Sequence, residues 1–149
     1  MSRFSAKKII IGLVLIFLIL VIGFSGKYIF SKQCISVEDP KFTDYEIVKV
    51  NIENRDMCLL VAGNPDQWIQ GLMYVRHPVK NYQGMIFSYP SLEPQQTFWN
   101  KNTFVDLTIY WMRDGKIVGK DKLPSIEKTK NIVTVSSPSA VDTVVEVID

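Results

Sequence analysis

The chain has 149 residues, of which 47% are hydrophobic and 21% charged, and this composition excludes a wholly disordered protein. Its length accommodates one ordinary domain with an extension and excludes two full domains. Seventeen Lys and Arg residues against fifteen Asp and Glu give a net charge of +2. Three of the cations, Arg3, Lys7 and Lys8, precede the first apolar run, and the remaining charges nearly cancel. We therefore expect no nucleic-acid partner.

An apolar run near the N-terminus predicts a membrane segment. Residues 9–24 carry no polar side chain, and the uncharged stretch continues to Gly26. A helix over residues 9–30 is long enough to cross a bilayer, at about 1.5 Å of rise per residue, with Lys27 reaching the interface. We predict an uncleaved signal anchor over residues 9–30. The alternative is a cleaved signal peptide, with small residues Gly23 and Ser25 before the cleavage site.

The flanking charges predict the orientation of this segment. Because three cations precede it, the positive-inside rule leaves residues 1–8 in the cytoplasm and exports the body of the chain. We expect a single-pass protein of the cell membrane, with the lipid bilayer as one partner. Residues 31–44 are weakly patterned and predict a juxtamembrane linker, so residues 45–149 form the extracytoplasmic domain.

The first half of the domain predicts a hairpin and a helix. Residues 47–52 alternate as a strand does, Asn54-Arg55-Asp56 predicts a turn, and residues 57–62 predict a second strand. Asn64-Pro65-Asp66-Gln67 has an N-cap, a proline at the first helical position and Gln at the third, which predicts a short helix ending near Met73.

The second half predicts strands over residues 85–89, 104–112, 116–118, 132–135 and 144–148, with a hairpin turn at Asp114-Gly115. The fold class is therefore all-β, a β-sandwich or open barrel with one short helix. Residues 104–112 alternate. One face is apolar and should be core (Val105, Leu107, Ile109, Trp111), whereas the other should be a partly exposed wall (Phe104, Asp106, Thr108, Tyr110).

The two cysteines of an exported domain can form a disulfide, because exported proteins meet an oxidising environment. A Cys34–Cys58 disulfide would tie the predicted linker to the first hairpin and close a loop worth roughly 3–4 kcal/mol in the chain-entropy model. The alternative is two unpaired thiols. The single histidine, His77, shares no metal-binding spacing with the cysteines, so we expect no metal and no cofactor. Cys58 lies in an apolar strand, which disfavours a nucleophilic Cys58–His77 pair, and no catalytic residue is predicted.

One polar patch stands out within an apolar context: Trp99, Asn100, Lys101, Asn102, Thr103 and Asp106. In the structural interpretation the Asn amides and the Thr hydroxyl satisfy backbone groups at a bend, and Trp99 packs in the core. In the functional interpretation the same polar groups form the floor of a small binding cleft with an aromatic wall.

These residues also carry a family likeness. Several short motifs resemble domain-of-unknown-function family 192 in order and spacing over about residues 46–148: Gly71-Leu72-Met73, Gly84-Met85-Ile86-Phe87, Phe98-Trp99-Asn100-Lys101-Asn102-Thr103, Asp106-Leu107 and Ser137-Pro138. The resemblance implies a small jelly-roll-like β domain, often exported or membrane-anchored in prokaryotes, with no established biochemical activity.

Two classes of function are consistent with the sequence. The first is a membrane-tethered, non-enzymatic extracytoplasmic domain that binds a small ligand or an envelope protein, or serves the envelope structurally. The second is a small envelope enzyme, such as a hydrolase, using Lys101 or Asp106 as acid or base near Asn100 and Asn102. An enzyme should bring at least two titratable groups into one cleft, with at least one shifted pKa.

Overall fold

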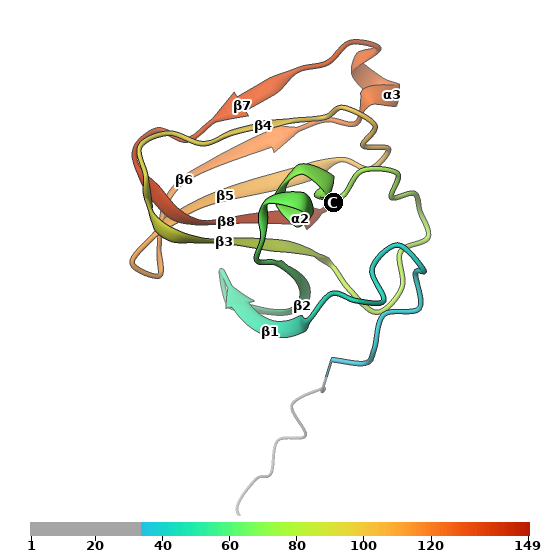
Figure 1. The fold of residues 1–149 in the computed structure, drawn as a ribbon. Coiled ribbons are helices and arrows are strands. Elements are labelled where there is room, and N and C mark those ends of the chain that lie inside the picture. Colours follow the sequence, from blue (N-terminus) through green and yellow to red (C-terminus); the bar gives the residue numbers. More distant parts are fainter. Residues whose placement is uncertain (1–33) are drawn as a thin grey trace, which may run out of the picture. The chain divides into compact units, whose positions relative to one another are not determined.

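The computed structural model describes residues 34–149, and this part of the chain contains eight strands and two short helices (Figure 1). Six strands form one sheet in the order β1-β2-β3-β8-β5-β6, and β4 pairs with β7 in a second sheet. The all-β prediction is confirmed. The elements are β1 (Ile47–Ile52), β2 (Arg55–Ala62), α2 (Pro65–Gln70), β3 (Gly84–Glu93), β4 (Thr97–Trp99), β5 (Leu107–Arg113), β6 (Lys116–Leu123), α3 (Ile126–Thr129), β7 (Thr134–Ser136) and β8 (Val141–Ile148).

Both predicted hairpins are present. Asp114 and Gly115 connect β5 to β6 with φ of 50° and 70°, the positive values that a two-residue hairpin turn requires. Glu53 and Asn54 do the same between β1 and β2, with φ of 49° and 63°. The first turn therefore lies one residue earlier than predicted, because β2 already begins at Arg55.

The larger sheet is mixed, because β2 and β3 are parallel whereas its other neighbours are antiparallel. A parallel pair needs a crossover connection, and α2 lies in it. The predicted start of this helix is confirmed, since Asn64 Oδ1 accepts from the Gln67 N–H at 3.0 Å and Gln67 Oε1 accepts from the Gly63 N–H at 2.9 Å. The helix ends at Gln70 rather than Met73, because Gly71 leaves the helical conformation with φ of 45°.

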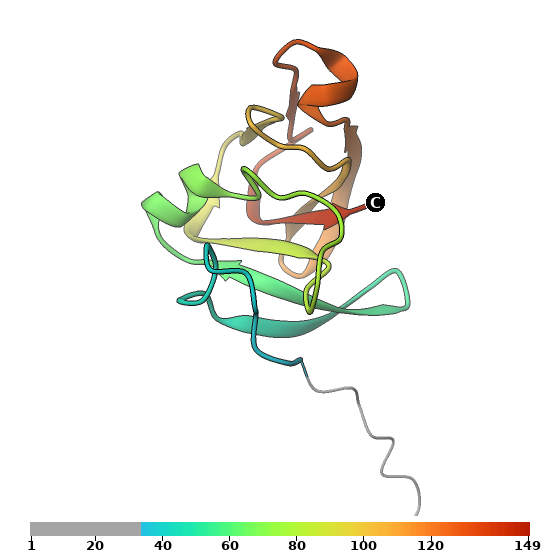
Figure 2. The ribbon, with the colours of Figure 1, turned by 90° about the vertical axis from the view of Figure 1, so that its right-hand side faces the viewer.

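The main core lies between the larger sheet, α2 and the β4–β7 sheet. In Figures 1 and 2, α2 lies over strands β3 and β8, against one face of the larger sheet. The predicted apolar face of residues 104–112 is part of this core, together with strands β2, β3 and β8. The core includes Phe42, Leu60, Leu72, Met85, Phe87, Val105, Leu107, Ile109, Trp111, Val141 and Val144.

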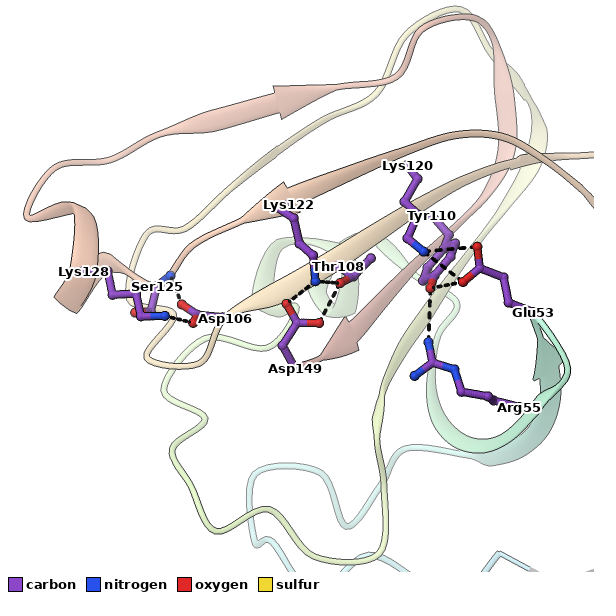
Figure 3. Close-up of polar contacts among 10 residues, drawn as sticks. All are labelled: Glu53, Arg55, Asp106, Thr108, Tyr110, Lys120, Lys122, Ser125, Lys128 and Asp149. Atoms are coloured by element: carbon purple, nitrogen blue, oxygen red, sulfur yellow. Dashed lines mark hydrogen bonds and ion pairs between the residues drawn. The ribbon is translucent and has the colours of Figure 1, made fainter.

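The opposite face of β5 is also buried, and the prediction of a partly exposed wall there is wrong for Thr108 and Tyr110, which are 3% and 0% exposed. The hairpin of β1 and β2 brings apolar residues onto this face, where they form a second core cluster (Ile52, Met57, Leu59, Tyr110, Val145, Val147). The Tyr110 hydroxyl donates to Glu53 at 2.9 Å, at the hairpin turn (Figure 3). The β1–β2 hairpin is far from β5 in the sequence, so the alternation of residues 104–112 could not predict that the hairpin covers this face.

The segment that precedes β1 belongs to the domain. Cys34 and Cys58 form a disulfide with a Cα–Cα distance of 5.6 Å, so the structure shows the first of the two alternatives for the cysteines. Phe42 is fully buried and packs edge-on against Tyr45 and Tyr82. Residues 34–44, which we predicted as the later part of a linker, are therefore integrated into the fold before residue 45.

The predicted membrane anchor, residues 9–30, lies outside the described residues. Within residues 34–149 no helix is both long and apolar enough to cross a bilayer.

Candidate functional site

The structure gives Asn100 a structural role. Its side chain is completely buried, and its Nδ2 donates to the Pro124 carbonyl at 2.9 Å and to Thr129 Oγ1 at 2.8 Å. Its Oδ1 accepts from the Val133 N–H at 2.9 Å. One amide thereby fixes the end of β4 to the segment that carries α3, as the structural interpretation of the patch expects.

Asn102 joins the same bend to the loop after α2. Its φ of 55° lies in the left-handed region, which Asn adopts more readily than other non-glycine residues. Its carbonyl accepts from the Tyr74 N–H at 2.7 Å, and its Nδ2 donates to the Tyr74 hydroxyl at 2.9 Å. Thr103 is buried beside it, where its carbonyl accepts from the Ile126 N–H at 2.9 Å.

Lys101 and Asp106 have different partners. The Lys101 ammonium lies 5.2 Å from the centre of the Trp99 ring. The Asp106 carboxylate accepts from the Ser125 N–H at 2.9 Å and pairs with Lys128 (Figure 3). The hydrogen bond from Lys128, followed by that from Ser125, lowers the pKa of Asp106. Lys101 and Asp106, each a candidate acid or base in the enzyme hypothesis, therefore contact different partners rather than each other.

Trp99 is 46% exposed, so the expectation that it packs in the core is wrong. It borders a groove of about 390 Å³ between α2, β3 and β4. We call this the aromatic groove; it is lined by Pro65, Trp68, Ile69, Tyr89, Glu93, Gln96, Thr97, Phe98 and Trp99. Of the predicted patch, only Trp99 reaches it. The Trp68 and Tyr89 rings lie 5.1 Å apart, and the Trp68 indole N–H donates to the Ala62 carbonyl, which holds this wall in place.

A buried carboxyl lies next to the groove. Glu146 is in the middle of β8, opposite Met85 of β3 and Ile109 of β5 in the register, and is 4% exposed. It lines a small hollow of about 30 Å³ that shares Trp68, Ile69, Phe98 and Trp99 with the aromatic groove. We call it the carboxyl hollow; its other lining residues are Gln70, Gly71, Leu72, Met73, Phe87 and Thr103.

The carboxyl of Glu146 is only half satisfied. The Leu72 backbone N–H bonds to it, whereas Oε2 is buried without a hydrogen-bond partner among the described residues. Burial raises the pKa of Glu146 to about 8, against the smaller lowering effect of Leu72. The side chain is therefore mostly protonated at neutral pH and carries an O–H that can donate.

The phenol of Tyr89, in the groove wall, lies within electrostatic reach of two carboxyls. Burial raises its pKa, and the negative charges of Glu146 and Glu93 raise it further. Tyr89 therefore stays neutral under ordinary conditions. The site presents aromatic faces, two neutral O–H groups and the half-buried Glu93, and among residues 34–149 no Lys or Arg lines either hollow.

Two glycines allow this arrangement. A Cβ at Gly84 would lie 1.9 Å from the Glu146 carbonyl oxygen, so only glycine lets β3 approach β8 so closely there. Gly71 has φ of 45° and faces both the Phe87 ring and Glu146 Oε2, since a Cβ there would lie 3.6 Å and 3.8 Å from them. The backbone at Gly84 and Gly71 therefore places the Glu146 carboxyl next to the turn that ends α2.

Glu146, Trp68 and Tyr89 were not predicted as site residues. The signal for Glu146 was a single acid inside an apolar strand, Val-Val-Glu-Val-Ile, where an ionisable group is costly without a partner. Trp68 and Tyr89 gave no comparable signal, because aromatic residues at such spacings usually belong to the core. Within residues 34–149 no group of three or more His, Cys, Asp and Glu side chains is arranged to hold a metal ion.

The match to a known family covers nearly all of this domain. The model of DUF192, described as an uncharacterized ACR, matches residues 47–149. The chain belongs to the DUF192 family. The expected resemblance is therefore confirmed for the family itself. A comparison with curated proteins finds no match.

Two solved structures are similar to this DUF192 chain. A candidate transcription regulator from Sinorhizobium meliloti is 26% identical, with a TM-score of 0.52 over 70% of this chain and 79% of that one. A protein of unknown function from Novosphingobium aromaticivorans is 19% identical, with a TM-score of 0.52 over 70% of this chain and 73% of that one. The second likeness shows the fold alone.

Proposed function

We propose that this DUF192 protein is a membrane-tethered, extracytoplasmic binding domain, without enzymatic activity, that takes a small ligand in the aromatic groove. The observation that carries the proposal is Glu146, whose buried Oε2 has no partner among the described residues beneath an aromatic wall. A buried polar atom left without a hydrogen bond costs about 1–3 kcal/mol, so it calls for an explanation. A bound ligand whose oxygen accepts a hydrogen bond from the protonated Glu146 carboxyl would explain why Oε2 has no partner.

The dimensions and chemistry of the groove support a small-molecule site. Its volume of about 390 Å³ is within the range of ligand pockets, which combine mostly apolar walls with a few polar groups. Glu146 and Tyr89 meet the criterion set for an enzyme, since two titratable groups with raised pKa values lie near one cleft. Both are protonated at neutral pH, however, so they could serve only as proton donors and not as a general base or nucleophile, and we favour binding.

The disulfide supports an extracytoplasmic location. Structural disulfides persist in oxidising compartments and are rare in the cytosol. Cys34, one of the two partners, follows the apolar run of residues 9–24 by ten positions, so the predicted export signal and an oxidised cysteine occur in the same part of the chain. The basic residues before the apolar run favour the same orientation.

The binding proposal is tested by NMR titration of the full-length chain in a non-ionic detergent with a panel of cationic, anionic and neutral small molecules. We expect at least one compound to shift the indole signals of Trp68 and Trp99 while that of Trp111, which is fully buried, stays in place. The Trp99→Ala variant should bind that compound at least tenfold more weakly. A panel without any compound that shifts the groove signals would count against a ligand site.

The location is tested by protease protection. If residues 9–30 are an uncleaved anchor with the N-terminus inside, protease added outside intact cells should remove the domain and leave a short membrane-bound stub. An epitope placed before Arg3 should stay protected until the membrane is opened. Recovery of a soluble mature form beginning near Gly26 would favour the cleaved signal peptide, and full protection of the domain would reverse the orientation.

A further inference from the structure

The aromatic groove has a marked electrostatic bias. Its wall presents four aromatic rings, those of Trp68, Tyr89, Phe98 and Trp99. The charged side chain in its lining is Glu93, and Glu146 lies next to it in the carboxyl hollow. Because Glu146 is mostly protonated at neutral pH, the negative charge at the groove is that of Glu93.

Aromatic rings attract cations, because the face of the ring carries negative charge, and Trp does so most strongly. Several rings around one cation give the cage that recognises alkylated ammonium groups, whose methyl groups also suit an apolar wall. Trp99 already contacts a cation in this structure, since the Lys101 ammonium lies 5.2 Å from its ring centre. Lys101 does not line the groove, which leaves its aromatic wall to a ligand.

We propose that the ligand of the aromatic groove is a small organic cation with an alkylated ammonium group, bound against Trp68 and Trp99 and balanced by Glu93. The inference rests on the proposed binding function and adds the chemical class of the ligand. The ammonium lies against the rings, and a hydroxyl or carbonyl of the same molecule accepts from the Glu146 O–H. A cation fits this groove better than an anion, which Glu93 would repel.

The test compares choline with 3,3-dimethyl-1-butanol, which has the same shape without the charge. Two of the three Trp residues of the chain line the groove, so tryptophan fluorescence of the full-length chain in non-ionic detergent reports occupancy. Ionic strength is held constant with NaCl when the two compounds are compared, and NaCl is raised in a separate series with choline. We expect choline to bind at least tenfold more tightly than the neutral isostere, and its affinity to fall with rising salt.

Three variants assign the effect to the groove. Trp99→Ala and Glu93→Gln should each weaken choline binding, Trp99→Ala by at least tenfold and Glu93→Gln by several-fold. Glu127→Gln is the matched control: this exposed acid on α3 pairs with Arg76 and does not line the groove, so its removal should leave the affinity unchanged. A third probe, glycerophosphocholine, distinguishes a free cation, which choline represents, from a lipid headgroup, which would bind more tightly with its phosphate attached.

The outcomes separate the two proposals. Equal binding of choline and the isostere, or loss of binding equally in Glu93→Gln and Glu127→Gln, would overturn the cation assignment and leave a ligand groove in place. Binding of anionic or neutral panel compounds without choline would do the same. Absence of any groove ligand in the NMR panel would overturn the proposed function itself.

Discussion

Stability of the folded domain should fall as pH rises from about 4.5 to about 8, and Glu146→Gln should abolish this fall. The folded pKa of Glu146 is about 8, against an ordinary value of 4.5. Below pH 4.5 the Glu146 carboxyl is protonated in both the folded and the unfolded chain. Between the two values the unfolded chain releases the proton and the folded chain keeps it, so ionisation stabilises the unfolded state. The total loss is on the order of 4 kcal/mol, since one pKa unit corresponds to about 1.4 kcal/mol.

Urea unfolding of the full-length chain, followed by fluorescence across this pH window, measures the effect. Gln has the shape of the protonated acid and accepts from the Leu72 N–H in the same way, so the variant should have a nearly flat profile there. Glu93→Gln is the control and should retain the wild-type slope. Below pH 4 the lowered pKa values of Glu53, Asp56 and Asp106 act in the opposite direction, and stability should fall again as those carboxylates are protonated. If the free energy of unfolding of the wild type does not change between pH 4.5 and pH 8, Glu146 ionises in the folded state at little cost in free energy.

Cys58→Ser should lower the free energy of unfolding by about 3–4 kcal/mol, the loss expected when a loop of this length is no longer closed in the unfolded chain. The disulfide spans 24 positions and anchors the segment that carries the buried Phe42. Because the single and the double variants remove the same bond, Cys34→Ser combined with Cys58→Ser should be close to Cys58→Ser alone. Reductant should bring the wild type to the same level and leave both variants unchanged.

Mass analysis provides the check on the bond itself. The unreduced protein should be lighter by two hydrogens than its reduced form and should resist alkylation until it is reduced. Two thiols that are freely alkylated in the folded, unreduced protein would reject the disulfide. In that case any loss of stability in Cys58→Ser would come from packing alone.

Sequence patterns predicted the elements whose causes are local. Asp114-Gly115 and Asn64-Pro65 carry their turn and cap chemistry within a few residues, so both elements lie where we expected them. Strand β4 and helix α3 were not predicted. Neither is locally distinct: β4 has three residues paired with β7, and α3 is one turn whose N-cap, Ser125, makes no capping hydrogen bond through its side chain.

The site depends on contacts that the sequence does not place. Trp99 was predicted as core or as an aromatic wall, and its neighbours decide for the wall: Trp68 comes from α2, within the crossover, and Tyr89 from β3. Asn100 and Asn102 were correctly assigned to a bend, yet their partners lie in loops that no spacing indicated. Glu146 becomes notable only when β3 and β5 enclose it, and Gly84 only when its missing side chain proves necessary.

The protonation state of Glu146 is measured most directly by ¹³C NMR of the glutamate side-chain carboxyls across a pH titration, with Glu146→Gln to assign the signal. A carboxyl that stays protonated beneath the aromatic groove at neutral pH should titrate with a midpoint near 8, the raised pKa that burial gives Glu146. A midpoint near the ordinary value of 4.5 would contradict a buried, neutral donor at the floor of the site.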